Sequence, residues 1–223
     1  VKKNPCVNSL YFATSNSGNN SYNIWRLEGD LKLDLVATRP YRIQTLCSHD
    51  GVLYDAGNYG EIFETISDKK GKHPVAVRDG TIVILCSHDG KLYDAGGSDK
   101  TISYITPGSR LICDSLRDFE GKHPVGIREN DINVLCSHEG KLYDAGDYDE
   151  IFDTLAKRIV AMRSEHTLAL CSHEGKLYDA GESGKIFETL IDPFGQDPIV
   201  EREHFVESLC SHAGILYDAG YYD

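Results

Sequence analysis

Serine, histidine and aspartate recur together five times along the chain, and these residue types can build a hydrolytic triad. Each set stands in the phrase Leu-Cys-Ser-His-x-Gly-x-Leu-Tyr-Asp-Ala-Gly, in which ten of the twelve positions never vary. A tight turn at Asp89-Gly90 would pair His88 with Lys91. Asp94 then lies three residues, or roughly 10 Å, farther along its strand. A triad needs contacts of about 3 Å between its members, so we expect no triad within one phrase.

An arginine stands eight residues before the cysteine of every phrase, and arginine can bind a carboxylate or another anion through paired hydrogen bonds. These candidate binding residues are Arg39, Arg78, Arg128, Arg163 and Arg202. The aspartates of the phrase are Asp55, Asp94, Asp144, Asp179 and Asp218, and antiparallel strands would put both sets at the same end of a sheet. Either each arginine pairs with an aspartate of its own or a neighbouring repeat as a structural staple, or the arginines face a channel and bind an anion. The staple is favoured, because five acids would neutralise five bases.

The histidines of the phrase are candidate metal ligands, and they lie beside the tight turn, at the opposite end from the aspartates. They are His49, His88, His138, His173 and His212. Metal ligands must converge, whereas residues beside the turns of different repeats diverge. We therefore expect no metal site and no cofactor. Each histidine is expected to donate a hydrogen bond to a neighbouring loop and to belong, with the aspartates, to a structural network.

A longer internal repeat must position these side chains. The phrase begins at Leu46, Leu85, Leu135, Leu170 and Leu209, with spacings of 39, 50, 35 and 39 residues. Such a period is typical of a four-stranded propeller blade. The chain, 1–223, is therefore predicted to be a single all-β domain, a β-propeller of four-stranded antiparallel blades. We name the strands A and B on either side of the tight turn, then C and D.

Strands C and D are predicted from short apolar runs that follow the phrase. Strand C is expected at Ile62-Phe63, Ile102 to Tyr104, Ile151-Phe152 and Ile186-Phe187. Strand D is expected at Val75 to Arg78, Val125 to Arg128, Ile159 to Arg163 and Ile199 to Arg202.

The two ends of the chain look complementary. Residues 8–45 read as a diverged repeat with strands at Leu10-Tyr11, Ile24-Trp25 and Leu35 to Arg39, in which Trp25 takes the phenylalanine slot. The last repeat supplies only strands A and B. We expect the terminal strands to share one blade and close the ring, which removes exposed sheet edges. Five blades are favoured, and six are possible.

The run Gly90-Lys91-Leu92-Tyr93-Asp94-Ala95-Gly96, followed by a short loop and an apolar strand, resembles the repeats of NHL-type propellers. The resemblance covers most of the chain, although the Cys-Ser-His before this run is not part of that pattern. It implies the propeller fold and no particular function.

Residues that break the repeat are candidates for ligand or partner contact. The longest spacing contains extra residues within Thr106 to Gly121, predicted to lie between strands C and D, with Arg110 and Arg117 as candidate binding residues. The loops after the phrase carry acids and tyrosines, among them Tyr59 and Tyr148. Such a rim suits protein or carbohydrate contacts, because tyrosine offers a rigid ring with a polar tip.

Composition narrows the partners and the compartment. Acidic residues outnumber lysine and arginine by 35 to 23, and the formal net charge of −12 argues against nucleic acid as a partner. The sequence contains no apolar run long enough to span a bilayer, so no membrane association is expected. Seven cysteines, five of them at one repeat position, favour a reduced, cytoplasmic protein.

The sequence leaves it undecided whether the protein is an enzyme, although it favours a non-catalytic protein. Three functions follow in order of preference. The first is a non-catalytic propeller that acts as a protein-interaction or ligand-binding scaffold, because the repeated polar residues look structural. The second is a multivalent lectin with equivalent sites between blades. The third is a metal-dependent hydrolase or lactonase with a site in the central channel.

Overall fold

The computed structural model describes residues 9–16, 21–28, 31–97 and 110–220. The chain forms two compact units, 1–102 with 112–124, and 103–111 with 125–223. The single domain expected from the sequence stays a prediction. The described residues contain no helix long and apolar enough to cross a membrane.

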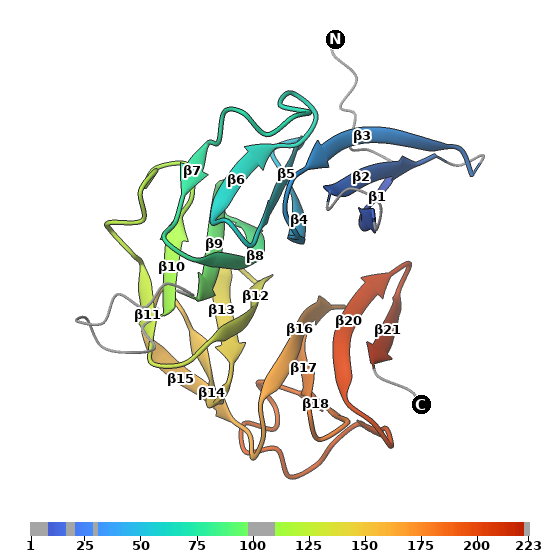
Figure 1. The fold of residues 1–223 in the computed structure, drawn as a ribbon. Coiled ribbons are helices and arrows are strands. Elements are labelled where there is room, and N and C mark those ends of the chain that lie inside the picture. Colours follow the sequence, from blue (N-terminus) through green and yellow to red (C-terminus); the bar gives the residue numbers. More distant parts are fainter. Residues whose placement is uncertain (1–8, 17–20, 29–30, 98–109, 221–223) are drawn as a thin grey trace. The chain divides into compact units, whose positions relative to one another are not determined.

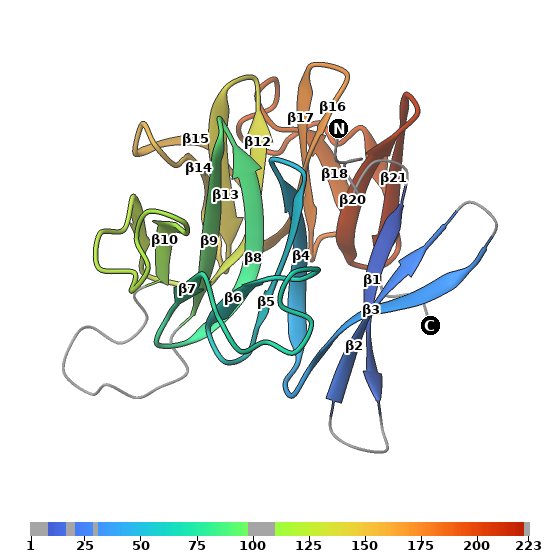
Figure 2. The same cartoon turned by 90° about the horizontal axis from the view of Figure 1, so that it is seen from above.

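Unit 1 consists of antiparallel sheets whose strands follow one another in chain order (Figure 1). The first sheet has three strands, β1 (Leu10–Asn16), β2 (Ser21–Leu27) and β3 (Leu33–Arg39). The second has four, β4 (Ile43–His49), β5 (Val52–Gly57), β6 (Glu61–Glu64) and β7 (Ala76–Val77). The third carries β8 (Thr81–His88), β9 (Lys91–Gly97) and β10 (Arg110–Asp114). Strands β4 and β8, the A strands of successive repeats, lie side by side (Figure 2).

Unit 2 repeats this pattern. After β11 (Gly126–Arg128) come two four-stranded sheets and a final hairpin. The four-stranded sheets are β12 (Ile132–His138), β13 (Lys141–Gly146), β14 (Tyr148–Asp153) and β15 (Arg158–Met162), and β16 (Thr167–His173), β17 (Lys176–Gly181), β18 (Lys185–Glu188) and β19 (Val200–Glu201). The hairpin is β20 (Val206–His212) with β21 (Ile215–Gly220). The strands predicted from the repeat are thereby confirmed, with one exception.

The exception is strand C of the second repeat. The predicted strand at Ile102 to Tyr104 lies outside the described residues, and the described strand that follows β9 in this sheet is β10. Ser115 N donates to Leu92 O, just as Thr65 N donates to Leu53 O in the repeat before it. Ile112 and Cys113 therefore take the places that isoleucine and phenylalanine take elsewhere. The extra residues precede strand C, so the prediction that they separate strands C and D was wrong.

The A–B hairpin follows from local chemistry. Asp89 and Gly90 both have positive φ, 46° and 66°, the conformation of the two-residue turns that match strand twist. The register pairs His88 with Lys91, as predicted, and Leu85 with Asp94. Histidine and aspartate of one phrase are therefore held apart by the hairpin itself.

The last glycine of the phrase is required by close packing. A side chain at Gly57 would collide with the carbonyl oxygen of Arg42, in the connection that leads from strand D into the next strand A. The interior around it is apolar, since Ile62 and Phe63 of strand C are fully buried. The connection and strand B are thus locked together at the end of the sheet where the arginines lie.

The terminal sheets keep the register of the repeat. Trp25 pairs with Phe12, as Phe63 pairs with Asp55, so Trp25 takes the phenylalanine slot and Phe12 replaces the aspartate. Strands β1 to β3 belong to unit 1, whereas β20 and β21 belong to unit 2. Ring closure through a blade shared by the two ends therefore stays a prediction.

Candidate functional site

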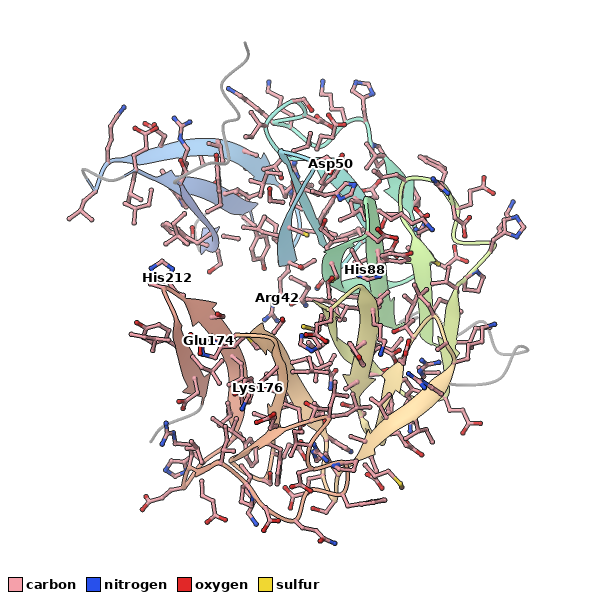
Figure 3. The ribbon with its side chains drawn as sticks, turned by 180° about the vertical axis from the view of Figure 1, so that it is seen from behind. Arg42, Asp50, His88, Glu174, Lys176 and His212 are labelled. Carbon is pink, nitrogen blue, oxygen red and sulfur yellow. The ribbon has the colours of Figure 1, made fainter. Side chains whose placement is uncertain are left out.

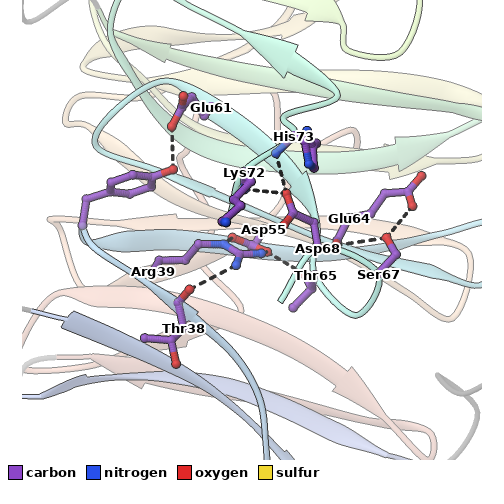
Figure 4. Close-up of polar contacts among 11 residues, drawn as sticks. Thr38, Arg39, Asp55, Glu61, Glu64, Thr65, Ser67, Asp68, Lys72 and His73 are labelled. Carbon is purple, nitrogen blue, oxygen red and sulfur yellow. Dashed lines mark hydrogen bonds and ion pairs between the residues drawn. The ribbon is translucent and has the colours of Figure 1, made fainter. Parts of the chain in front are cut away.

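The first arginine and aspartate of the repeat meet in a buried two-pronged ion pair. Arg39 donates from Nε to Asp55 Oδ2 at 2.7 Å and from Nη2 to Asp55 Oδ1 at 2.6 Å. Figure 4 shows the two side chains facing one another. Thr65 Oγ1 donates a third hydrogen bond to the same carboxylate at 2.8 Å. Burial raises the pKa of Asp55, and the hydrogen bonds and positive charge of Arg39 oppose that rise.

This ion pair joins two successive sheets. Arg39 ends β3 of the first sheet, while Asp55 belongs to β5 of the second. The guanidinium also lies over the Phe63 ring, 4.8 Å from its centroid, which adds a cation–π contact. Gly71, at φ 62°, lies against the arginine side chain. Each side of the guanidinium group is thus covered by protein.

The same pair recurs in every repeat, always sixteen residues apart. The others are Arg78 with Asp94, Arg128 with Asp144, Arg163 with Asp179 and Arg202 with Asp218, with N–O distances of 2.5 to 2.8 Å. The hydroxyls of Ser115, Thr154 and Thr189 donate to three of these aspartates. The structure therefore pairs each of the five arginines selected from the sequence with one of the five selected aspartates.

A second set of links lies near the tight turns. His49 Nδ1 and Ser87 Oγ are 2.9 Å apart, and the same pairing joins His138 to Ser172 and His173 to Ser211. These three histidines thus contact the strand A serine of the following repeat, not a loop as predicted, because successive A strands lie side by side.

The histidine–serine pairs have no phrase aspartate beside them. The acid beside His49 is its neighbour Asp50, whose Oδ2 lies 3.6 Å from Nε2, beyond hydrogen-bond distance. Figure 3 shows Glu174 in the equivalent turn between β16 and β17, Lys176 at the start of β17, and His212 at the end of β20. Among the described residues, no group of three or more histidine, cysteine, aspartate or glutamate side chains could hold a metal ion.

The two selected tyrosines have different environments. Tyr59 is 68% exposed and its ring lies against Tyr41, with centroids 4.6 Å apart. Tyr148 is buried and donates its hydroxyl to Asp144 at 2.8 Å, so it extends the internal network. Tyr41 was not selected from the sequence, although its aromatic ring breaks the pattern of the connection between strands D and A.

The two candidate arginines of the long spacing lie on different local elements. Arg110 begins strand β10, where it was expected in an insertion. Arg117 is largely exposed and its Nε lies 3.8 Å from Asp114 Oδ2. Arg117 is therefore an exposed cation beside a local acid.

Two pockets occupy equivalent junctions within unit 2. One, of about 370 Å³, is lined by Arg128, Tyr148, Glu150 and Phe152. The other, of about 170 Å³, is lined by Arg163, Ser183, Lys185 and Phe187, the corresponding positions of the next repeat. Both have an arginine and a phenylalanine, but Tyr148 is exchanged for Ser183 and Glu150 for Lys185. The walls therefore differ in size and charge, which weakens the prediction of equivalent lectin sites.

Searches against protein-family models and against curated protein sequences find no match. Solved structures do match. The computationally designed Ika8 protein has a TM-score of 0.58 and 11% identity, over 95% of this chain and 64% of that one. The WD40 β-propeller domain of Doa1 has a TM-score of 0.54 and 10% identity, over 95% and 86%. Saccharomyces cerevisiae Sqt1 has a TM-score of 0.59 and 11% identity, over 96% and 66%.

These similarities show the fold, which is a β-propeller of four-stranded antiparallel blades. The chain spans slightly less than two thirds of the length of the designed protein and of Sqt1. The resemblance to NHL-type repeats stays a prediction, because the matched domain is a WD40 propeller. At such low sequence identity, the similar fold does not show that this chain shares an activity with the matched proteins.

Proposed function

We propose that this chain is a non-catalytic β-propeller scaffold that presents its loop surface to a protein partner. The observation that supports the proposal is that the repeated polar side chains form hydrogen bonds and ion pairs with one another inside the protein. Each arginine pairs with an aspartate, and three histidines pair with the serine of the next repeat. Groups held in this way are suited to keeping blades together.

The loop surface of unit 1 offers a contact suited to a partner. The exposed Tyr59 ring is backed by Tyr41, whose hydroxyl donates to Glu61 Oε2 at 2.6 Å. Arg42 is exposed beside it, and Asn58 N donates to Arg42 O. A rigid exposed tyrosine next to an arginine has the composition of a binding hot spot.

The experiment is site-specific photo-cross-linking in the native cell. A photoreactive residue at position 42 should give a discrete protein adduct, and adding Tyr59→Ala should abolish it. The control places the same residue at Lys70, which is exposed in the loop between strands C and D of the same unit. The proposal would be contradicted if both positions gave the same adducts, or if Tyr59→Ala left the adduct from position 42 unchanged.

We also propose a cytoplasmic location, and the state of the cysteine thiols supports it. The six described cysteines are free, from Cys47 to Cys210. Burial raises the pKa of Cys113 and of Cys136 to about 12, which keeps these thiols protonated and unreactive. Such side chains act as compact apolar groups in a reducing compartment.

A further inference from the structure

One junction of unit 1 holds an aromatic side chain of the protein itself. The Tyr41 ring lies over Phe63, with centroids 6.4 Å apart and an interplanar angle of 28°. Its other neighbours are the Tyr59 ring and Glu61, which accepts the hydroxyl hydrogen. Burial, reinforced by Glu61, raises the pKa of Tyr41, so the phenol stays protonated. The junction is therefore a slot for a flat ring with a polar tip.

The corresponding junction in unit 2 has the same backbone. Gly60 N donates to Gly57 O at 3.1 Å, and Gly184 N donates to Gly181 O at 3.1 Å. The φ angles of Gly60 and Gly184 are 72° and 71°. The loop between strands B and C therefore turns in the same way in both repeats, and the side chains that it carries distinguish the two slots.

Three side chains of the slot differ. Counted from the repeat arginine and the phrase, Glu165 stands where Tyr41 stands, Ser183 where Tyr59 stands, and Lys185 where Glu61 stands. The floor is unchanged, since Arg163 lies over Phe187 at 4.6 Å, as Arg39 lies over Phe63. Without either tyrosine, the slot is a pocket of about 170 Å³ lined by all of these unit 2 residues.

The pocket has room for one aromatic ring. An engineered apolar cavity of about 150 Å³ in another protein holds benzene. The polar end of the slot has reversed its character, because Lys185 donates hydrogen bonds where Glu61 accepts one. Lys185 is half exposed and pairs only loosely with Glu201, at 3.7 Å, so its ammonium group can turn to a ligand.

We propose that this pocket binds a small aromatic carboxylate. The ring lies over Phe187 in the position that Tyr41 takes over Phe63, and the carboxylate accepts a hydrogen bond from Lys185. The Arg163 guanidinium contributes little net charge, because Asp179 neutralises it. Glu165, exposed at the rim, is the opposing charge that weakens binding. This inference stands apart from the proposed partner surface, which lies in unit 1.

The test is titration of the protein with benzoate, followed by protein-observed NMR. We expect shifts confined to residues of the pocket, and no such shifts with benzylammonium, which has the same ring and the opposite charge. Lys185→Glu recreates the residue of the Tyr41 slot. This substitution should weaken benzoate binding about tenfold, which is the effect of losing one charge-assisted hydrogen bond. Lys141→Glu, at the exposed start of β13 in the same unit, is the matched control and should leave benzoate binding unchanged.

A second variant tests the shape of the pocket. Glu165→Tyr recreates Tyr41 and should fill the slot, so that benzoate no longer binds while the circular dichroism spectrum is unchanged. Glu165→Gln should instead tighten benzoate binding severalfold. The proposal is overturned if benzoate shifts other residues, if benzylammonium binds as well as benzoate, or if folded Lys185→Glu protein binds benzoate like the parent.

Discussion

Removing one acid from a buried arginine pair should be among the most damaging single substitutions in unit 2. In Asp179→Asn the guanidinium of Arg163 remains buried without a balancing charge, since the two side chains are only 5% and 2% exposed. Breaking a buried ion pair costs about 3 to 5 kcal/mol of unfolding free energy. The amide oxygen of asparagine still accepts one hydrogen bond, which puts the expected loss near the lower value, about 3 kcal/mol.

The last repeat supplies a matched control with the same chemistry. The pair of Arg202 and Asp218 has the same two-pronged geometry, but its side chains are 40% and 15% exposed. Water screens such a pair, so Asp218→Asn should cost about 1 kcal/mol or less. The two substitutions therefore isolate burial as the cause of the difference.

Urea denaturation followed by circular dichroism measures both losses. The double variant Arg163→Met with Asp179→Leu should recover most of the stability, because an apolar pair of similar volume leaves no buried charge. Equal losses for Asp179→Asn and Asp218→Asn, or a loss below about 1 kcal/mol for the former, would refute the reasoning.

Three further predictions concern the same unit. Thr189→Val removes the hydrogen bond to Asp179 and should lower the unfolding free energy by about 1 to 3 kcal/mol in the same urea assay. Burial raises the pKa of Asp192, but hydrogen bonds from backbone N–H groups outweigh this and leave the pKa below its ordinary value. Its stabilisation is thus present above about pH 4 and lost as the pH falls through the lower folded pKa, so the loss caused by Asp192→Ala should shrink between pH 7 and pH 3. A thiol reagent should label exposed Cys210 well before buried Cys136 in the native protein, as peptide mass spectrometry will report.

The sequence predicted the elements that depend on neighbouring residues. A turn such as Asp89-Gly90 needs only its own two residues to reverse the chain, so the A–B hairpins and their register could be read directly. The approach of arginine and aspartate could also be foreseen, because strand direction alone puts both at one end of a sheet. Which sheets the pair would join could not be foreseen, since that depends on how successive sheets pack.

The features that the sequence did not predict depend on contacts between repeats or on positions where a repeat departs from the common residues. Strand C of the second repeat escaped because Ile112-Cys113 replaces the isoleucine–phenylalanine pair and a longer segment precedes it. The histidine–serine links escaped because the partner serine lies on a neighbouring A strand, which no local register specifies. The role of Tyr41 escaped for the same reason, since its slot is made by the loop of the following blade.

By itself, the sequence of this protein determined the repeat, the order of the strands and the propeller fold, because these follow from periodicity and from turns of adjacent residues. Only the tertiary structure decided that Arg39 bonds across two sheets and that Glu165 lines a pocket where Tyr41 fills a slot. The physical reason is that side chains distant in sequence meet only when the sheets pack, and that packing fixes both the partner and the space left beside it.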